Sequence, residues 1–152
     1  MNDGVGEEPS LIPIHLIRRH CTDRASREAV RMALKIGIVG LNGIGKNHAA
    51  CYQEDDLADL IAVCDVVKER ADAVAEKYGV KAYYSLKDMI ENEPDLQIVD
   101  VTTGGIDNGS WHFEPAMEAV SYGKHVLVEK PICHDVQQAR ELVAYADKQK
   151  VY

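Results

Sequence analysis

Short apolar runs alternate with longer stretches of helical periodicity along the chain from Leu34 onward. This alternation is typical of a parallel sheet that is covered by helices on both faces. The apolar runs predict strands at residues 34–39, 60–65, 96–102 and 125–130, with a brief strand near 81–84. The sequence ends at Tyr152, where a sixth strand would begin. The pattern predicts an α/β fold, a Rossmann-type doubly wound parallel sheet truncated at the sixth strand.

Helix signals lie between these runs. A helix is expected from about Gly43, and Ser85 and Asp135 are suited to cap two later helices. Gly79 and Gly123 suit left-handed helix ends, and Pro115 suits a first helical turn. The spacing predicts two buried helix faces, formed by Val67, Ala71, Val74, Ala75 and Tyr78 and by Val136, Ala139, Leu142, Val143 and Ala146.

Residues 1–31 have a different pattern, in which acidic residues precede a short apolar run and arginines follow it. This order is the reverse of a secretory signal. We expect residues 1–31 to be a disordered or mis-assigned extension and residues 32–152 to be one globular domain. The alternative is a short helix at residues 26–32 that docks on the domain.

The composition excludes several classes of protein. A net charge of -8 argues against binding to nucleic acid or anionic lipid mainly through phosphate contacts. No apolar run approaches the length of a membrane-spanning helix, about 20 residues. The cysteines, at positions 21, 51, 64 and 133, have no metal-ligand spacing, so we expect buried or inert thiols and a cytoplasmic location.

The stretch KIGIVGLNGIGKNH, residues 35–48, is a candidate phosphate site. A strand, a glycine turn and a helix together present unpaired main-chain N–H groups and a positive helix end, here over Gly43 and Ile44. Gly40 and Gly45 take the first and third places of the G-x-G-x-x-G pattern, and Asn42 takes the second. Asparagine tolerates positive φ, so we expect the turn to survive at Asn42. We expect the diphosphate to lie slightly further out, or Gly43 to supply the close approach.

Asp65 is the second anchor. It follows the second strand, 25 residues after Gly40, where an acidic residue accepts hydrogen bonds from the adenosine ribose. A carboxylate there repels a 2′-phosphate, and Val66 and Val67 offer no cation, so the sequence favours NAD over NADP although Lys68 is near. The alternative makes Asp65 a cap for the following helix.

Four segments, GLNGIGKNH, CDVVKERA, VTTGG with WHFEPAMEAVSYGKHVL, and VEKP, resemble the nucleotide-binding half of the Gfo/Idh/MocA oxidoreductases. The resemblance covers about residues 34–152, and EKP after GKHVLV is its most specific element. It implies a dinucleotide-binding domain and cofactor contacts from Thr103 and Gly104. The family usually reads threonine, proline, asparagine and then histidine there, whereas this chain has Thr103, Gly104, Gly105 and an insertion before His112.

The resemblance also implies that Glu129 and Lys130 lie beside the nicotinamide and that Lys130 moves the proton of the substrate hydroxyl. Oxidation of an alcohol releases a proton with the hydride, and a partly buried lysine can share that proton. We therefore expect partial burial of Lys130, and a cis peptide before Pro131. His112 is a second candidate near the reaction centre or the cofactor, whereas His48 and His125 are expected to be structural.

The family's substrate domain, which would carry the other catalytic groups, is absent from the sequence. We therefore expect a chain that binds NAD with little turnover, whose parent enzyme transfers a hydride to or from a sugar, inositol or related polyol. The alternative is a free-standing dinucleotide-binding module, or a subunit that needs a partner chain. A missing final strand and an uncovered sheet face also predict poor solubility or self-association.

Overall fold

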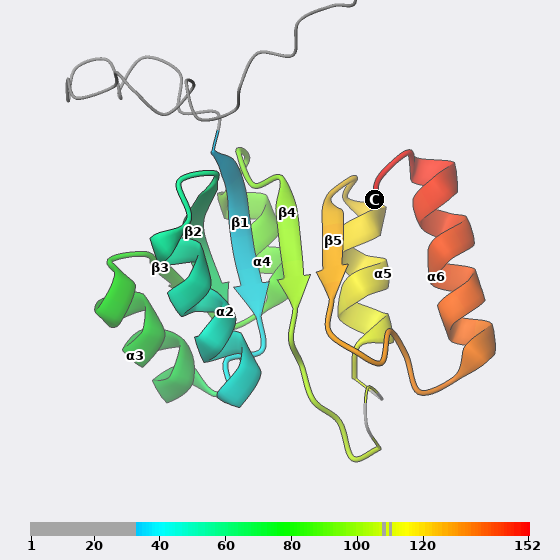
Figure 1. Ribbon diagram of the computed structural model, residues 1–152, viewed down its shortest axis with the longest axis horizontal. Helices are drawn as coiled ribbons and strands as arrows, with labels where there is room; N and C mark the ends of the chain where they lie inside the picture. The colour runs from blue at the N-terminus through cyan, green and yellow to red at the C-terminus, as the bar shows by residue number, and fades with distance from the viewer. Residues whose placement is uncertain (1–32, 108, 110) are drawn as a thin grey trace, which may run out of the picture. The chain divides into compact units, whose positions relative to one another are not determined.

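The computed structural model describes residues 33–107, 109 and 111–152. Its strands are β1 (Leu34–Val39), β2 (Ala58–Cys64), β3 (Lys81–Tyr83), β4 (Ile98–Val101) and β5 (His125–Val128). Its helices are α2 (Gly43–Glu54), α3 (Lys68–Tyr78), α4 (Leu86–Asn92), α5 (Phe113–Ser121) and α6 (Val136–Gln149). Strands and helices alternate along the chain, as the sequence predicts (Figure 1).

The strands form one parallel sheet in the order β3-β2-β1-β4-β5. This order reverses between β1 and β4, which start crossovers toward opposite sides of the sheet (Figure 1). Ligands of open α/β sheets bind outside the carboxyl ends of the strands at such a reversal. The described domain is therefore an α/β Rossmann-like fold, and the predicted fold class is confirmed.

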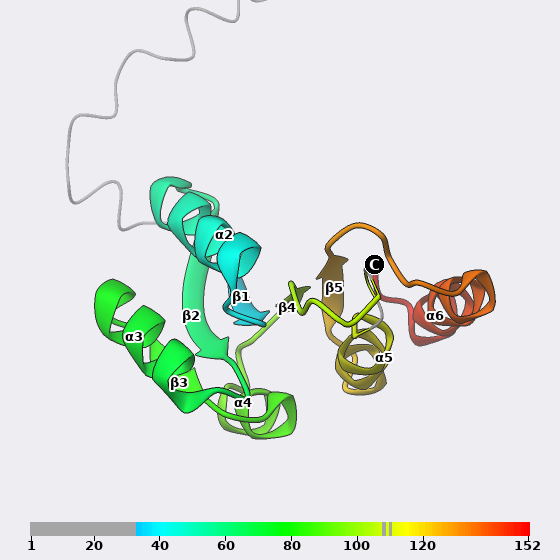
Figure 2. The same cartoon turned by 90° about the horizontal axis from the view of Figure 1, so that it is seen from below.

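Two apolar cores lie on the two faces of the sheet, because successive strand residues point to opposite sides. One core joins the sheet to α2 and α3 through Ile38, Leu60, Val63, Ala49 and Ala71, among others. The other joins it to α4, α5 and α6, and includes Val99, Val101, Met89, Val120 and Leu142. Figure 2 shows α2 on one side of the sheet and α4 and α5 on the other.

The predicted helix caps are present, whereas the strand limits differ from those predicted. The Ser85 hydroxyl accepts a hydrogen bond from the Asp88 N–H, and the Asp135 carboxylate accepts from the N–H groups of Gln137 and Gln138. Gly79 ends α3 at a φ of 69°, and Gly123 follows α5 at a φ of 70°. Several strands are shorter than predicted, and Asp65 and Glu129 lie just beyond strand ends instead of within them.

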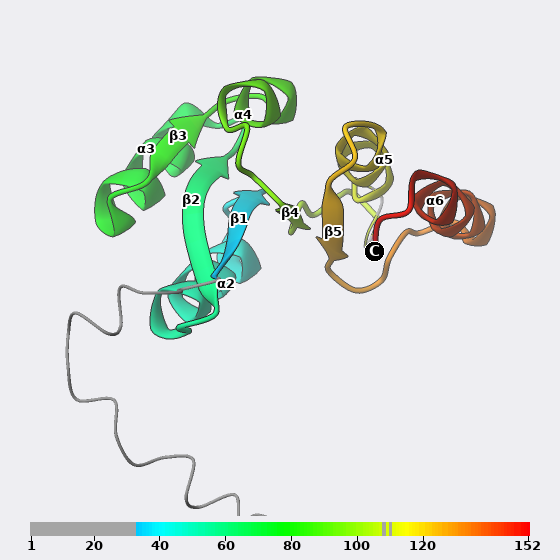
Figure 3. The same ribbon diagram turned by 90° about the horizontal axis from the view of Figure 1, so that it is seen from above.

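The predicted buried face of α6 is wrong at two positions. Val136 is 66% exposed and Val143 is 52% exposed, whereas Leu142 is buried and Ala139 and Ala146 pack against the core. The reason is that α6 packs on α5 along one narrow stripe, and in the described part of the chain nothing covers its adjacent side. Figure 3 shows α6 beside α5 and the end of the chain beside β5.

The predictions for residues 1–31, including the alternative helix at residues 26–32, lie outside the described residues. No described helix has the length and apolar character needed to cross a membrane. Of the described cysteines, Cys64 and Cys133 are buried, whereas Cys51 is exposed. Burial raises the pKa of the Cys64 thiol to about 12, so this group is unreactive.

Candidate functional site

The turn after β1 is built on Gly40, which has a φ of 96°. Its N–H donates to the Cys64 carbonyl at 2.9 Å, and its carbonyl accepts from the Thr102 hydroxyl at 2.5 Å. A Cβ at Gly40 would lie 2.6 Å from the Thr103 nitrogen, which is closer than real contacts allow. The turn therefore requires glycine both for its backbone angle and for its packing against the end of β4.

Gly45, in the first turns of α2, brings the helix against this turn. A Cβ there would overlap the Gly40 carbonyl oxygen and lie 2.7 Å from the Thr102 hydroxyl. This is the close packing of helix on strand that the third glycine of the motif provides. Thr102 itself was not predicted as a site residue, although it is the first polar residue after the apolar run of β4.

The expectation of positive φ at Asn42 is wrong. Asn42 has a φ of -81° and a ψ of -173°, and it precedes α2 as an extended, exposed cap residue. The residue with positive φ is Gly40, because the chain reverses direction there. The backbone is extended again at Asn42, just before α2 begins. Gly43 and Ile44 are exposed, and a Cβ at Gly43 would meet nothing within 4 Å. The N-terminal turn of α2 therefore presents N–H groups without helical partners to open space.

Asp65 lies directly after β2 and is only 5% exposed. One carboxylate oxygen accepts from the Leu41 N–H of the glycine turn at 2.7 Å, and the other accepts from the Val67 N–H at 2.8 Å. Val67 itself is the N-cap residue of α3, and Asp65 accepts no N–H from the described first turn of that helix, so the alternative role of Asp65 as its cap is not found. A carboxylate can accept about four hydrogen bonds, so acceptor sites remain for ligand hydroxyls.

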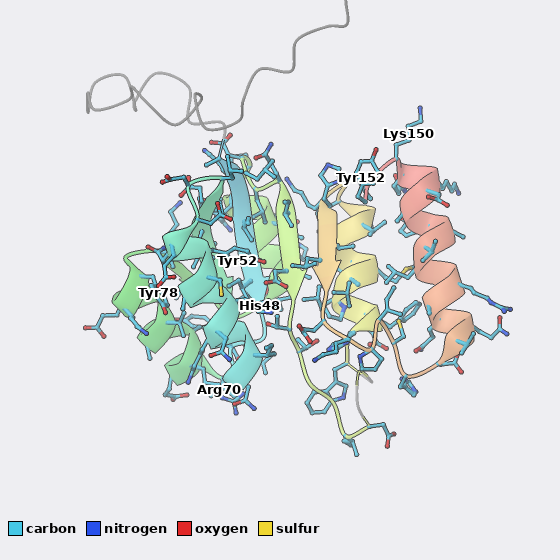
Figure 4. The ribbon with its side chains drawn as sticks, viewed as in Figure 1. His48, Tyr52, Arg70, Tyr78, Lys150 and Tyr152 are labelled. Atoms are coloured by element: carbon cyan, nitrogen blue, oxygen red, sulfur yellow. The ribbon has the colours of Figure 1, made fainter. Side chains whose placement is uncertain are left out.

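Arg70 is a cation that the sequence analysis missed. Its guanidinium nitrogen lies 3.7 Å from the Asp65 carboxylate, and its side chain is partly exposed. Figure 4 shows Arg70 near the edge of the domain where α2 and α3 begin. The spacing from Asp65 to Arg70 is the only sequence signal, because a residue five positions on can return toward a strand end through the first turn of a helix. Arg70 matters for the choice between NAD and NADP, since an arginine can pair with a 2′-phosphate.

The loop after β4 carries Thr103 and Gly104. The Thr103 hydroxyl donates to the Trp111 carbonyl at 2.6 Å, and the Gly104 carbonyl accepts from the Trp111 N–H at 3.4 Å. A Cβ at Gly104 would meet no atom within 4 Å, and the Trp111 side chain is exposed. The two predicted contact residues therefore border open space, on a loop that is held together by its own hydrogen bonds.

His112 is 3% exposed, and its Nδ1 lies 2.7 Å from the Pro131 carbonyl oxygen. It ties the start of α5 to the segment after β5. The peptide bond between Lys130 and Pro131 is cis, which confirms that prediction. The predicted role of His112 in catalysis stays a prediction, because in this geometry the imidazole holds Pro131.

Glu129 and Lys130 follow β5. The Glu129 carboxylate accepts from the Lys130 N–H at 3.2 Å and lies 3.3 Å from the Lys130 ammonium nitrogen. The expected partial burial of Lys130 is wrong, because its side chain is 90% exposed. Burial favours the neutral form of Glu129, but the hydrogen bond and the charge of Lys130 outweigh it and lower the pKa of Glu129. The contact with Lys130 therefore favours the ionised form of Glu129.

Main-chain hydrogen bonds bring these segments to one edge of the sheet. Gly40 N–H donates to Cys64, Thr102 N–H to Val39, and Glu129 N–H to Val101, each at 2.9 Å. The ends of β2, β1, β4 and β5 are thus adjacent in that order, and in Figure 1 the arrowheads of β1, β4 and β5 point to the same edge. The structure therefore brings the predicted residues of all four segments together on the carboxyl edge.

The fold and this edge define an NAD(P)-binding Rossmann domain of an oxidoreductase. The sequence profile of the oxidoreductase family with an NAD-binding Rossmann fold, Gfo/Idh/MocA, matches residues 34–152. The chain belongs to this family. The resemblance stated from the four sequence segments is confirmed.

Individual relatives are enzymes that act on polyols and sugars. The chain is similar to inositol 2-dehydrogenase from Salmonella paratyphi B, with 31% identity over 120 residues, which is 77% of this chain and 34% of the relative. It is also similar to the crystal structure of the WlbA dehydrogenase from Bordetella pertussis in complex with NADH and UDP-GlcNAcA. That comparison has a TM-score of 0.71 and 28% identity, and covers 78% of this chain and 36% of the other.

A third similar structure carries the other nicotinamide cofactor. It is KijD10, a 3-ketoreductase from Actinomadura kijaniata in complex with NADP, with a TM-score of 0.71 and 25% identity over 78% of this chain and 37% of that one. Both cofactors therefore occur among similar structures. The chain spans about a third of the length of the curated relatives that it matches.

Proposed function

We propose that this chain is the cofactor-binding part of an oxidoreductase that transfers a hydride between NAD and a sugar, an inositol or a related polyol. The diphosphate lies on the N-terminal turn of α2, next to Gly43 and Ile44. The adenosine ribose hydroxyls bind Asp65, and the nicotinamide lies toward Thr103, Gly104, Glu129 and Lys130. The bound cofactor supplies the hydride chemistry, and the described residues bind and orient it.

One observation carries this proposal. The carboxylate of Asp65 accepts a hydrogen bond from the Leu41 N–H, so the ribose anchor and the glycine turn form one preorganised unit. The first turn of α2 beside this unit is open, as the free space over Gly43 shows. A helix N-terminus with a carboxylate at the end of the neighbouring strand is the arrangement that receives a dinucleotide.

Calorimetric titration of the full chain with NAD and with NADP tests the proposal. A matched pair of substitutions tests the position of the diphosphate. Gly43→Asp and Gly43→Asn have side chains of nearly the same shape, but only the first adds a negative charge. We expect Gly43→Asp to weaken binding at least roughly tenfold relative to Gly43→Asn, because like charges repel at close range. Equal affinities of the two variants, or no binding by the folded wild type, contradict the proposal.

Asp65 and Arg70 together set the cofactor preference that we propose. The buried carboxylate favours the free 2′-hydroxyl of NAD, and the Arg70 guanidinium leaves a weaker site for the phosphate of NADP. We expect Arg70→Ala to weaken NADP binding roughly tenfold, about 1.4 kcal/mol, with little effect on NAD. Lys77→Ala removes the same charge from the other end of α3 and is the control. Equal losses for NAD and NADP would assign Arg70 no role in the preference.

We propose further that the chain binds cofactor with little turnover. Lys130 is exposed, so the described residues provide no desolvated environment for proton transfer at its amine. The exposed lysine also favours the second possibility, a binding module or a subunit that requires a partner chain to cover this corner. Binding without turnover of myo-inositol or glucose is the expected result, and turnover by the chain alone contradicts it.

Two properties complete the proposal. The exposed free thiol of Cys51 favours a reducing compartment, which we take to be the cytoplasm. We also propose self-association through β5, whose outer edge borders an apolar groove of about 290 Å³. Val126, Val128, Ile132 and Val143 line this groove.

A further inference from the structure

A buried carboxylate in the middle of the sheet has no place in the proposed cofactor site. Asp100 lies in β4, opposite Ile38 of β1 and Leu127 of β5, and it is 0% exposed. Its Oδ2 accepts a hydrogen bond from the Tyr52 hydroxyl at 2.8 Å and lies 2.8 Å from His48 Nδ1. Its Oδ1 has no hydrogen-bond partner among the described residues. A buried carboxylate with an unsatisfied oxygen is costly, so a packing role alone does not explain it.

His48 connects this carboxylate to the corner after β5. Its second ring nitrogen, Nε2, lies 3.4 Å from Glu129 Oε1, and the other oxygen of Glu129 faces Lys130. Asp100, His48, Glu129 and Lys130 therefore form a continuous series of polar contacts from the interior of β4 to the carboxyl edge. Figure 4 shows His48 and Tyr52 on neighbouring turns of α2, in front of the sheet.

The contacts of His48 require one proton more than a neutral imidazole beside two carboxylates provides. Both ring nitrogens face carboxylate oxygens, which only accept hydrogen bonds when they are ionised. An imidazolium carries an N–H on each side, whereas a neutral imidazole carries only one, so the other contact then requires a protonated carboxyl group. Burial raises the pKa of Asp100, and the hydrogen bonds from His48 and Tyr52 oppose this change. The nearby charge of Glu129 raises the pKa of Asp100 as well.

We propose that Asp100 and His48 are positioning residues, which hold one exchangeable proton against Glu129 and thereby orient Glu129 and Lys130. Transfer of the proton from His48 Nε2 to Glu129 Oε1 converts an imidazolium and two carboxylates into an imidazole, a carboxyl group and one carboxylate. The total charge of the three groups stays at -1, so the transfer needs no counterion. Loss of the charge on Glu129 weakens its contact with Lys130 and frees the ammonium group.

Other titratable groups face this series and can affect it. Tyr52 contacts Asp100 from α2, and Asp100 and burial raise the pKa of its phenol, so it stays a neutral donor. Cys51 lies next to Tyr52 on the same helix. Lys130 faces Glu129 from the end of β5. The role of Asp100 and His48 in orienting Lys130 rests on the proposed function. The proton that they share with Glu129 does not depend on it.

Carbon-13 NMR of the Glu129 carboxyl group, followed as a function of pH in the full chain without cofactor, tests the proposal. The Glu129 signal is assigned by its loss in Glu129→Gln. In the wild type we expect two inflections for Glu129, because its carboxylate shares a proton with the Asp100–His48 pair. In Asp100→Asn and in His48→Gln we expect a single inflection, and in His48→Gln a higher pKa for Glu129 because the charge of His48 is lost.

Tyr52→Phe is the control, because it removes a hydrogen bond from Asp100 but leaves the series intact. It should retain both inflections, whereas a loss of packing alone would affect all three variants equally. A single Glu129 inflection in the wild type, or two inflections in His48→Gln, overturns the proposal. If Asp100→Asn fails to fold, the number of Glu129 inflections in the wild type and in His48→Gln still tests the proposal. Failure to bind NAD would remove the proposed function and leave this titration unchanged, so the two results are distinguishable.

Discussion

Gly40 and Gly45 form one contact, in which a backbone carbonyl lies where a side chain of residue 45 would be. The hydroxyl of Thr102 donates to that carbonyl, so three residues from β1, α2 and β4 fix the turn. Gly43, only two positions away, has open space instead. At the scale of single residues, glycines of the same motif therefore have different physical roles, one in packing and one beside the ligand space.

This difference predicts opposite effects of the same substitution. Gly45→Ala should destabilise the domain by about 1–3 kcal/mol, because the methyl group must displace backbone and Thr102. Gly43→Ala should stabilise it by up to about 1 kcal/mol, because alanine favours the helix and meets no neighbour. Urea denaturation of both variants measures the free energies of unfolding. An unchanged free energy of unfolding in Gly45→Ala would contradict the prediction, because it would mean that α2 and the Gly40 turn separate at low cost.

At the scale of elements, α6 shows how a cap and a packing face are specified separately. Asp135 accepts two main-chain N–H groups at its start, and Leu142 is its one fully buried side chain. The hydrogen bonds from Gln138 and Gln137 lower the pKa of Asp135. The start of the helix is therefore fixed by local hydrogen bonds, whereas the burial of Val136 and Val143 depends on neighbours that the helix itself does not provide.

The cap predicts a pH dependence of stability. Because the folded-state pKa of Asp135 is lowered, its contribution is present above the unfolded-state pKa of about 3.9 and is lost as pH falls through the folded value. Asp135→Asn keeps an acceptor oxygen without the charge. The difference in unfolding free energy between wild type and Asp135→Asn should therefore shrink from neutral to acid pH. Asp107→Asn, in the exposed loop after β4, is the control for removal of a surface charge. A difference that stays constant with pH would contradict the assignment.

At the scale of the whole domain, β5 is the last strand of the sheet, so one of its edges pairs with β4 and the other faces outward. Val126 N–H donates to the Tyr152 carbonyl at 2.7 Å, so the end of the chain occupies one position on the outer edge of β5. Val128, two residues on, points its N–H to the same edge. Exposed Val136 and Val143 continue the apolar surface along α6. An open edge beside apolar side chains favours association with another chain.

Sedimentation velocity over a wide range of concentrations measures the proposed self-association. We expect the sedimentation coefficient to rise with concentration in the wild type and to change little in Val143→Lys, which places a charge in the groove. Val66→Lys adds the same charge at an exposed valine after β2, away from the groove, and should behave as the wild type. A concentration-independent monomer in the wild type would rule out self-association through this edge.

The order of strands and helices, the caps at Ser85 and Asp135, and the glycine turn followed from the sequence alone. These features depend on residues near one another in the chain, through hydrophobic period, main-chain hydrogen bonds and backbone angle. The strand limits and the φ at Asn42 were predicted less well, because both depend on how the chain reverses against the end of β4. The motif correctly assigns the tight turn to its first glycine, Gly40, but it does not give the backbone angles of the residue at its second place.

Tertiary structure alone decided which distant side chains meet. The Thr102 hydroxyl donates to the Gly40 carbonyl, and His48 lies between Asp100 and Glu129, which are 52 and 81 positions away from it in the chain. The exposure of Lys130, Val136 and Val143 is likewise set by what packs around them. The sequence determined the elements because their causes are local. Pairing of charges and burial depend on contacts across the sheet, and only the folded domain defines those contacts.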